Sequence, residues 1–174
     1  MHFVIVQDHK ENRRKCTLTP LVGREGITFL CLGHPKRQAF ELEVPGGILL
    51  HIDGPPLRRA DATILGNGKV LLVDSTWARV PKVLKRLKVA SGMRLERRSL
   101  PRELVTAYPR RSKLNRDPDE GLASVEALFL AAAILGEPEP DLLRHYRWSG
   151  EFLERNFEQL QAFCPELKCL LVNL

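Results

Sequence analysis

The stretch "KVLLVDSTWARVPKVLKRL", residues 69–87, changes its chemical character several times within a short segment. The apolar run 70–73 ends on Asp74, which is followed by two hydroxyl side chains and Trp77. Apolar runs of this length are typical of strands that are covered on both faces, as in a parallel sheet. In open parallel sheets, ligands bind beyond the carboxyl ends of the strands. This turn is therefore the first candidate for a functional site.

The residues after the turn predict an amphipathic helix with basic side chains largely on its outer face. Its apolar face would be formed by Trp77, Val80, Leu84 and Leu87, and Pro81 suits a first helical turn. Acidic and hydroxyl residues after a strand are also common helix caps, and a tryptophan at such a junction often belongs to the core. The pattern alone leaves a structural and a functional interpretation about equally favoured.

Outward from this turn, the first part of the chain reads as short strands separated by Gly- and Pro-containing turns. Apolar runs at 2–6, 27–32 and 47–52 join 69–73 as four candidate strands. The segment 93–100 alternates apolar and basic residues and predicts an edge or exposed strand. We therefore expect an α/β fold with a mostly parallel sheet.

After residue 100 the pattern becomes helical. Residues 121–137 predict a strong helix that Gly136 and Pro138 would end. A second helix is expected over 140–148, and a third over 150–163 with Ser149 as its N-cap. We expect an α/β N-terminal half, 1–100, and an all-helical C-terminal half, 101–174, closely packed as one unit.

The net charge of +6 is unevenly distributed along the 174 residues. Residues 79–116 carry 13 basic and 2 acidic side chains, whereas residues 117–174 carry 4 basic and 11 acidic ones. The two regions could pack together by charge complementarity. Alternatively, the basic region forms a cationic face for a phosphate backbone, where Lys and Arg displace condensed counterions.

Several classes of protein are disfavoured by the remaining composition. No apolar run reaches the ~18 residues of a membrane span, and the start of the chain shows no basic leader. The four cysteines have no regular framework, and the five histidines form no metal-ligand spacing. We expect a cytoplasmic monomer with reduced thiols, no metal and no membrane partner.

Four stretches, taken in order, resemble a known family of RNA-modifying enzymes. They are "RKCT" (14–17), "LLVDSTW" (71–77), "LPRELVTAYP" (100–109), and "LASVEALFLAAAILG" (122–136) with "WSGEFLERN" (148–156). The chain is similar to the aminocarboxypropyltransferases that modify a pseudouridine of small-subunit ribosomal RNA during ribosome maturation. A related branch that acts on tRNA uridine has an Asp-x-Thr-Trp signature, which "DSTW" also satisfies.

The resemblance implies a SPOUT-type fold with a deep trefoil knot around a site for S-adenosylmethionine (SAM). It also implies that the 3-amino-3-carboxypropyl (acp) group, and not the methyl group, leaves the sulfonium. A uracil ring nitrogen would attack the methionine γ-carbon, and methylthioadenosine would depart.

Three residues of the resemblance would contact the nucleoside and sulfonium parts of SAM. Val73 matches a strand-end residue whose backbone meets the ribose, and Leu100 matches a leucine whose backbone reads the adenine edge. Trp77 matches the aromatic residue that encloses the sulfonium methyl, where cation–π attraction contributes ~0.5–2 kcal/mol.

Four further residues would lie at the methionine end and the substrate side. Thr17 and Ser124 match residues that meet the methionine moiety, and Ala127 lines the same wall. Asp74 matches an acidic residue on the substrate side, where it would orient the base and act as a weak catalytic base. Ser124 could equally be a plain helix N-cap.

RNA would meet two basic loops if both border the pocket: Arg13, Arg14 and Lys15, and Arg110, Arg111 and Lys113. Two departures from the family pattern are the grounds for keeping an inactive member of the family as an alternative. Its Cys-Thr-Gly turn is Cys-Thr-Leu here, and the segment 110–121 is longer than usual. The expected RNA partner is the small-subunit rRNA or a pre-ribosomal particle. One alternative is the same transfer to tRNA, which is less favoured. The other alternative is a catalytically idle RNA-binding assembly factor.

Overall fold

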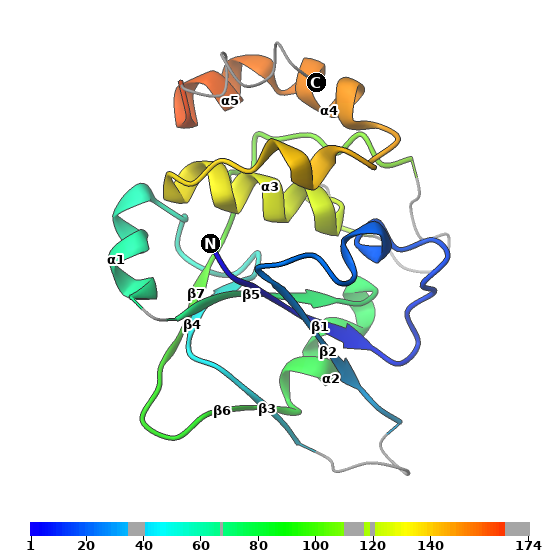
Figure 1. Ribbon diagram of the computed structural model, residues 1–174, viewed down its shortest axis with the longest axis vertical. Coiled ribbons are helices and arrows are strands. Elements are labelled where there is room, and N and C mark those ends of the chain that lie inside the picture. The colour runs from blue at the N-terminus through cyan, green and yellow to red at the C-terminus, as the bar shows by residue number, and fades with distance from the viewer. Residues whose placement is uncertain (35–40, 67, 110–116, 119–120, 166–174) are drawn as a thin grey trace.

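The computed structural model describes residues 1–34, 41–66, 68–109, 117–118 and 121–165. Its centre is a five-stranded, wholly parallel sheet in the order β2-β1-β5-β4-β7 (Figure 1). The strands of this sheet are β1 (Phe3–Asp8), β2 (Ile27–Leu32), β4 (Gly47–Leu50), β5 (Lys69–Asp74) and β7 (Leu95–Arg98). A second parallel pair joins β3 (Leu42–Val44) to β6 (Leu87–Val89). The mostly parallel α/β fold is confirmed.

Helices cover the main sheet in layers. Those of the α type are α1 (Ala62–Leu65), α2 (Val80–Leu84), α3 (Ser124–Leu135), α4 (Ser149–Arg155) and α5 (Phe157–Phe163). Helix α3 packs on one face of the sheet, and α4 and α5 lie beyond it, whereas α2 and the β3–β6 pair lie on the other face (Figure 1).

Alternation along the central strands divides the core between these two faces. In β1, Phe3 and Ile5 belong to the apolar cluster that contains α3, whereas Val4 and Val6 belong to the cluster that contains Val83 of α2. Successive side chains of a strand point to opposite faces, so a strand buried on both faces is apolar throughout. The polar side chains at the ends of β1 and β5 likewise point to alternate faces of the sheet.

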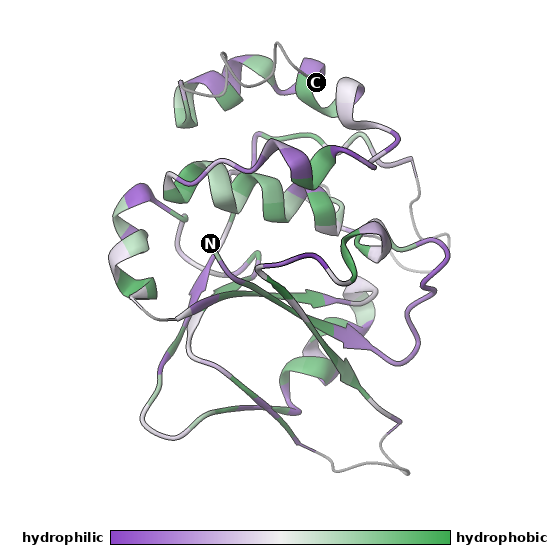
Figure 2. Ribbon diagram, in the orientation of Figure 1, coloured by the Kyte–Doolittle hydropathy of each residue, from purple (hydrophilic) through white to green (hydrophobic). Residues whose placement is uncertain are grey.

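Helix α3 is the central layer of the molecule. Every residue from Val125 to Leu135 is buried, because the sheet lies on one side of the helix and the later helices on the other. Figure 2 shows this helix and the central strands as hydrophobic, in contrast to the hydrophilic loop after β1. Gly136 ends the helix with a left-handed φ of 89°, which confirms the predicted stop.

The strands that the sequence predicted are present, with small shifts at their ends. The predicted run 27–32 coincides with β2, and the runs 2–6, 47–52 and 69–73 correspond to β1, β4 and β5. The segment 93–100 contains β7, which is an edge strand of the sheet as expected.

The helix predicted after Trp77 is shorter than expected. Trp77–Arg79 forms a 3-10 turn, and α2 ends at Leu84. Leu87 does not lie on its apolar face, because it begins β6 and pairs there with Leu42 of β3. The prediction was wrong here because the pairing partner, β3, has only three residues and was not identified in the sequence.

The C-terminal helices also differ from the prediction. Only Pro140–Leu143 of the expected helix 140–148 is helical, as a 3-10 turn. The expected helix 150–163 is divided at Asn156, whose side chain forms two hydrogen bonds with the backbone of Val105. Ser149 is the first residue of α4 and not its cap.

The remaining organisational predictions have mixed outcomes. One apolar cluster contains residues from both sides of residue 100, and the division into 1–100 and 101–174 stays a prediction. None of the helices in the described part of the chain combines the length and apolarity that crossing a bilayer requires. Cys16 and Cys31 are free thiols, and Cys169 lies outside the described residues.

Candidate functional site

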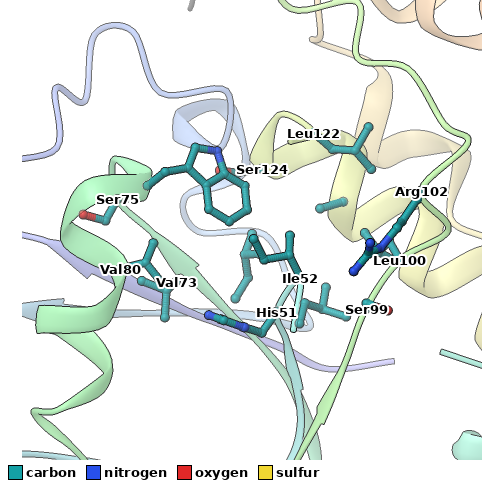
Figure 3. A pocket seen from close by; sticks show the side chains of 14 residues that line it. His51, Ile52, Val73, Ser75, Val80, Ser99, Leu100, Arg102, Leu122 and Ser124 are labelled. Carbon is teal, nitrogen blue, oxygen red and sulfur yellow. The ribbon is translucent and has the colours of Figure 1, made fainter. Parts of the chain in front are cut away.

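A cleft opens where the carboxyl ends of β4, β5 and β7 meet the start of α3 (Figure 3). Its first lobe encloses about 800 Å³ when space open to solvent is counted. Most of its walls are apolar. It is lined by Leu50, His51, Ile52, Leu72, Val73, Ser75, Trp77, Val80, Ser99, Leu100, Arg102, Leu122, Ser124 and Ala127.

A second, more polar lobe adjoins the first. The two lobes share Ser75, Trp77, Leu122 and Ser124, so they form one continuous cleft. The further lining of the second lobe comes from Glu11, Lys15, Cys16, Thr17, Asp74, Thr76, Thr106, Tyr108, Asp117, Pro118, Gly121 and Ala123. Its carboxylates and hydroxyls suit a ligand with charged or polar groups.

The cleft collects the cofactor-site residues that the sequence predicted. Val73, Trp77, Leu100, Ser124 and Ala127 line the first lobe. Thr17 and Asp74 line the second lobe, where they are joined by Trp77 and Ser124. These residues come from four separate segments of the chain, and their role in binding a cofactor stays a prediction.

The carboxylate of Asp74 connects the segments that form the second lobe. Its Oδ2 accepts hydrogen bonds from Gln7 Nε2 at 3.1 Å and from Cys16 Sγ at 3.0 Å, and its Oδ1 accepts one from Ser124 Oγ at 2.9 Å. Asp74 is buried at the end of β5, directly opposite Gln7 in β1. With three donors bound, this carboxylate holds β1, the loop after it and the start of α3 in place.

The start of α3 is held by contacts that the sequence did not indicate. Ser124 is the first helical residue, the N-cap is Ala123, and the interpretation of Ser124 as a plain N-cap is wrong. The backbone N–H of Val125 donates to Thr17 Oγ1 at 3.3 Å. The hydroxyl of Thr17 therefore satisfies one of the exposed N–H groups that every helix start leaves open.

A second carboxylate, Asp8, holds the turn after β5 from the opposite face of the sheet. It accepts hydrogen bonds from two guanidinium nitrogens of Arg79, Nε and Nη2, and, at 2.9 Å, from the hydroxyl of Ser75. Burial opposes ionisation of Asp8, but the bonds from Arg79, Ser75 and the Lys10 backbone outweigh it and lower the pKa to about 2. The turn from Asp74 to Arg79 is thus fixed at both ends.

Cys16 lies in the second lobe but is not a nucleophile. Burial, and after it the neighbouring Asp74 carboxylate, raise the pKa of the Cys16 thiol to about 12. The thiol stays protonated at neutral pH and donates to Asp74. Cys16 is therefore a structural residue of this lobe.

Glu126 is the most deeply buried carboxylate near the cleft and has no solvent exposure. Its oxygens accept hydrogen bonds from Thr106 Oγ1 at 2.6 Å, Ala107 N at 2.9 Å, Ala123 N at 2.8 Å and Tyr146 Oη at 2.8 Å. All four partners donate, as a carboxylate anion requires. Glu126 therefore ties the segment 106–107 and Tyr146 to the first turn of α3.

Aromatic rings extend this connection to the loop before Thr17. Tyr146 and Tyr108 each meet the ring of Trp148 edge to face, with centroids 5.7 and 5.1 Å apart. The hydroxyl of Tyr108 donates to the backbone carbonyl of Lys15 at 3.0 Å. Both ends of Tyr108 are thus engaged, which disfavours its use as a free stacking platform for a base.

The first of the two predicted RNA-binding loops lies at the mouth of the second lobe. Lys15 lines this lobe, and Arg13 and Arg14 are exposed just before it. The other predicted contacts, Arg110, Arg111 and Lys113, lie outside the described residues.

Sequence reasoning missed several residues of the site. His51 and Arg102 line the first lobe, and Gln7 supports Asp74. His51 directly follows β4, so the reasoning about strand ends that selected Asp74 could also have identified it. Within the described ranges no three His, Cys, Asp or Glu side chains are arranged as metal ligands.

Comparisons with known proteins place this cleft in context. A sequence profile of the family described as "Ribosome biogenesis protein, C-terminal" matches residues 49–168. A search of curated protein sequences found no match. Among solved structures, the chain is similar to the SAM-dependent rRNA:acp-transferase Tsr3 from Vulcanisaeta distributa, with 26% identity and a TM-score of 0.65. The similarity covers 93% of this chain and 82% of the other.

We predict that Glu126→Gln destabilises the protein by roughly 2–3 kcal/mol, because its amide group would face two buried donors that now have an acceptor. Tyr146→Phe removes only one of the four donors and should cost about 1 kcal/mol. Urea denaturation of both variants measures the difference. Equal stability of Glu126→Gln and the unaltered protein would contradict this account of the network.

The Asp8–Arg79 pair should make stability depend on acidity. Because the folded pKa of Asp8 is depressed, its contribution is complete above pH ~4 and is lost as the pH falls towards 2. We expect Asp8→Asn to cost roughly 2 kcal/mol at pH 7 and much less near pH 2. Urea denaturation at both pH values, with Glu158→Gln as an exposed control, tests this. If the difference in free energy of unfolding between Asp8→Asn and the unaltered protein is the same at both pH values, the proposed contribution of the Asp8–Arg79 pair is refuted.

Proposed function

The chain belongs to the family of ribosome biogenesis proteins defined by their C-terminal domain, and on this premise we propose that it is a SAM-dependent transferase acting on ribosomal RNA. It moves the acp group to a uridine or pseudouridine of the small-subunit rRNA. The observation that carries this proposal is the continuous cleft at the strand ends, found in a chain similar to Tsr3 over 93% of its length.

The first lobe suits the adenosine part of SAM. Its apolar walls accept a flat base, and the strand-end backbone at Val73 and the backbone at Leu100 supply polar edges for ribose and adenine. Trp77 lies on the border of both lobes, where an aromatic face stabilises a sulfonium. Ala127 leaves room on the α3 side of the same wall.

The second lobe suits the methionine arm of the cofactor. Ser124 donates its proton to Asp74, so its oxygen remains an acceptor and matches the α-ammonium group of the arm better than the carboxylate. Thr17 lies beside it at the start of α3, whose positive end favours an anionic group. The chemistry that SAM supplies is an acp group on a good leaving group, methylthioadenosine.

The transfer itself needs little from the protein beyond alignment. The uracil ring nitrogen forms a bond to the γ-carbon as the carbon–sulfur bond breaks, and the nitrogen loses its proton to solvent or to Asp74. Because Asp74 already accepts three hydrogen bonds, we assign it mainly to positioning the reactants, with weak base action.

The finer expectations from the resemblance belong to the same proposal. We propose a SPOUT-type chain path with a trefoil knot around the first lobe, an all-helical C-terminal half, a monomeric state and a cytoplasmic site of action. The likeness to Tsr3 supports the fold underlying these expectations. The RNA partner is the small-subunit rRNA or a pre-ribosomal particle, in preference to tRNA.

The product nucleoside distinguishes acp transfer from methyl transfer. Incubation of the protein with SAM and a small-subunit rRNA fragment should release methylthioadenosine, detected by mass spectrometry. Release of S-adenosylhomocysteine would show methyl transfer instead. Absence of heat in calorimetry with millimolar SAM would favour an idle assembly factor. Mass spectrometry of nucleosides from a deletion strain would identify the modified RNA.

Trp77→Ala provides the matched test of the cofactor site. We expect its affinity for SAM to fall by roughly 3–30-fold, because cation–π attraction is worth ~0.5–2 kcal/mol, while the protein stays folded. Calorimetry with SAM and a thermal melt measure both properties. A collapsed fold would favour a purely structural role for Trp77, and unchanged affinity would remove it from the site.

Reversing charge at Arg13 and Arg14 tests the RNA side. The double variant Arg13→Glu/Arg14→Glu should bind RNA more weakly and reduce the slope of log affinity against log salt by about 1–2, with little change in SAM affinity. The control Lys85→Glu/Lys88→Glu changes the same number of exposed charges near the β3–β6 pair. An unchanged slope in the first variant would exclude these two arginines from the RNA interface.

A further inference from the structure

His51 lies in the first lobe of the cleft, outside the set of residues assigned to cofactor contacts. It directly follows β4, and its side chain is 11% exposed. Figure 3 shows the imidazole ring among the lining side chains, with Val73 and Ser99 also labelled around the same space. A mostly buried imidazole in a ligand cleft is either a packing residue or a hydrogen-bonding group.

A backbone hydrogen bond fixes the proton of this imidazole. The N–H of Asp53 donates to His51 Nδ1 at 3.2 Å, so Nδ1 acts as an acceptor and carries no proton. The neutral ring then has its proton on Nε2. Among the described residues Nε2 has no hydrogen-bond partner, so its N–H is available to a ligand.

The surroundings keep the ring neutral. Burial lowers the pKa of His51 below its ordinary value, the exposed Asp53 carboxylate opposes this effect, and Arg97 of β7 adds to it. Asp53 Oδ2 lies 3.6 Å from Nδ1, too far for a hydrogen bond. At neutral pH the ring is therefore an uncharged donor with a fixed tautomer.

Other polar side chains of the lobe are less able to serve as fixed donors. Ser75 and Ser124 already donate their hydroxyl protons to Asp8 and Asp74. Arg102 is exposed, and a long exposed side chain loses conformational entropy when it is ordered. Ser99 has a freely rotating hydroxyl. The indole N–H of Trp77 belongs to a ring on the border with the second lobe and not to the strand-end edge where His51 lies.

We propose that His51 donates a hydrogen bond from Nε2 to adenine N3 of the bound nucleoside and so helps the enzyme to select and orient adenosine. This inference rests on the proposed function. Strand β4 lies between β5 and β7 in the sheet. If Val73 at the end of β5 contacts the ribose and Leu100 after β7 contacts the adenine, a donor after β4 meets the edge of the base next to the sugar. N3 is the acceptor at that edge.

The test uses methylthioadenosine, its 3-deaza analogue and its 7-deaza analogue as ligands in calorimetry. The unaltered protein should bind the 3-deaza analogue roughly fivefold more weakly than methylthioadenosine, as expected for one lost hydrogen bond. The 7-deaza analogue keeps N3, so His51 should contribute equally to the binding of this analogue and of methylthioadenosine. His51→Leu should bind the parent roughly fivefold more weakly and should no longer distinguish it from the 3-deaza analogue.

Matched variants separate hydrogen bonding from packing. His51→Gln places an amide donor near the Nε2 position and should restore most of the affinity and the preference for N3. His145→Leu, at an exposed histidine, controls for the substitution itself. Thermal melts show which variants are folded, and the two deaza ligands test the proposal on the unaltered protein even if His51→Leu does not fold.

Three results would overturn the inference. Equal binding of the parent and the 3-deaza analogue by the unaltered protein would remove N3 as the acceptor. A folded His51→Leu variant that still discriminates would assign the discrimination to another group. Failure of the unaltered protein to bind any of the nucleosides would refute both this inference and the proposed cofactor site, whereas binding without dependence on His51 would refute the inference alone.

Discussion

The cleft depends on one buried carboxylate with three donors. Asp74 accepts hydrogen bonds from Gln7 in β1, from Cys16 in the following loop and from Ser124 at the start of α3. These groups lie far apart in the sequence, so the loop and the helix are placed only after the sheet has formed. A buried charge is costly unless donors satisfy it, and here the required donors are also the walls of the second lobe. The same contacts that make the charge tolerable therefore build the site.

Because successive side chains of a strand point to opposite faces of the sheet, Asp74 and Asp8 support the site from different sides. Gln7 and Asp74 are partners in the parallel register and face α3, whereas Asp8, one residue later in β1, faces α2 and binds Arg79 and Ser75. Hydrogen bonds on both faces of the sheet therefore hold the turn from Asp74 to Arg79, and Trp77 lies in the middle of this turn. Glu126 gives comparable support on the far side of the cleft. Rigid support of this kind keeps reacting groups aligned, and alignment is the main contribution available to this chemistry.

The long buried elements could be predicted from the sequence because their patterns are local. The four apolar strands and α3 follow directly from continuous apolarity and helical spacing. The three-residue strands β3 and β6 could not be predicted, because each is stabilised by pairing with the other across a long stretch of chain. The break at Asn156 likewise depends on the backbone of Val105. At the cleft, the residue types at strand ends were identifiable, but the partners of Asp74 and the fixed tautomer of His51 are properties of the folded chain.

The Cys-Thr-Leu turn shows how a departure from the family pattern is accommodated. A glycine at this position would matter if the backbone needed a conformation closed to other residues. Leu18 instead has φ of −90° and ψ of −11°, a negative φ at the edge of the right-handed helical region that does not require glycine. Its side chain is completely buried in the cluster that contains α3, and its N–H donates to Cys16 Sγ at 3.4 Å. The leucine thus anchors the turn in the core while Cys16 and Thr17 still reach Asp74 and Val125. Loss of the glycine is therefore compatible with an intact second lobe, and it removes one of the two grounds for regarding the protein as an idle member of its family.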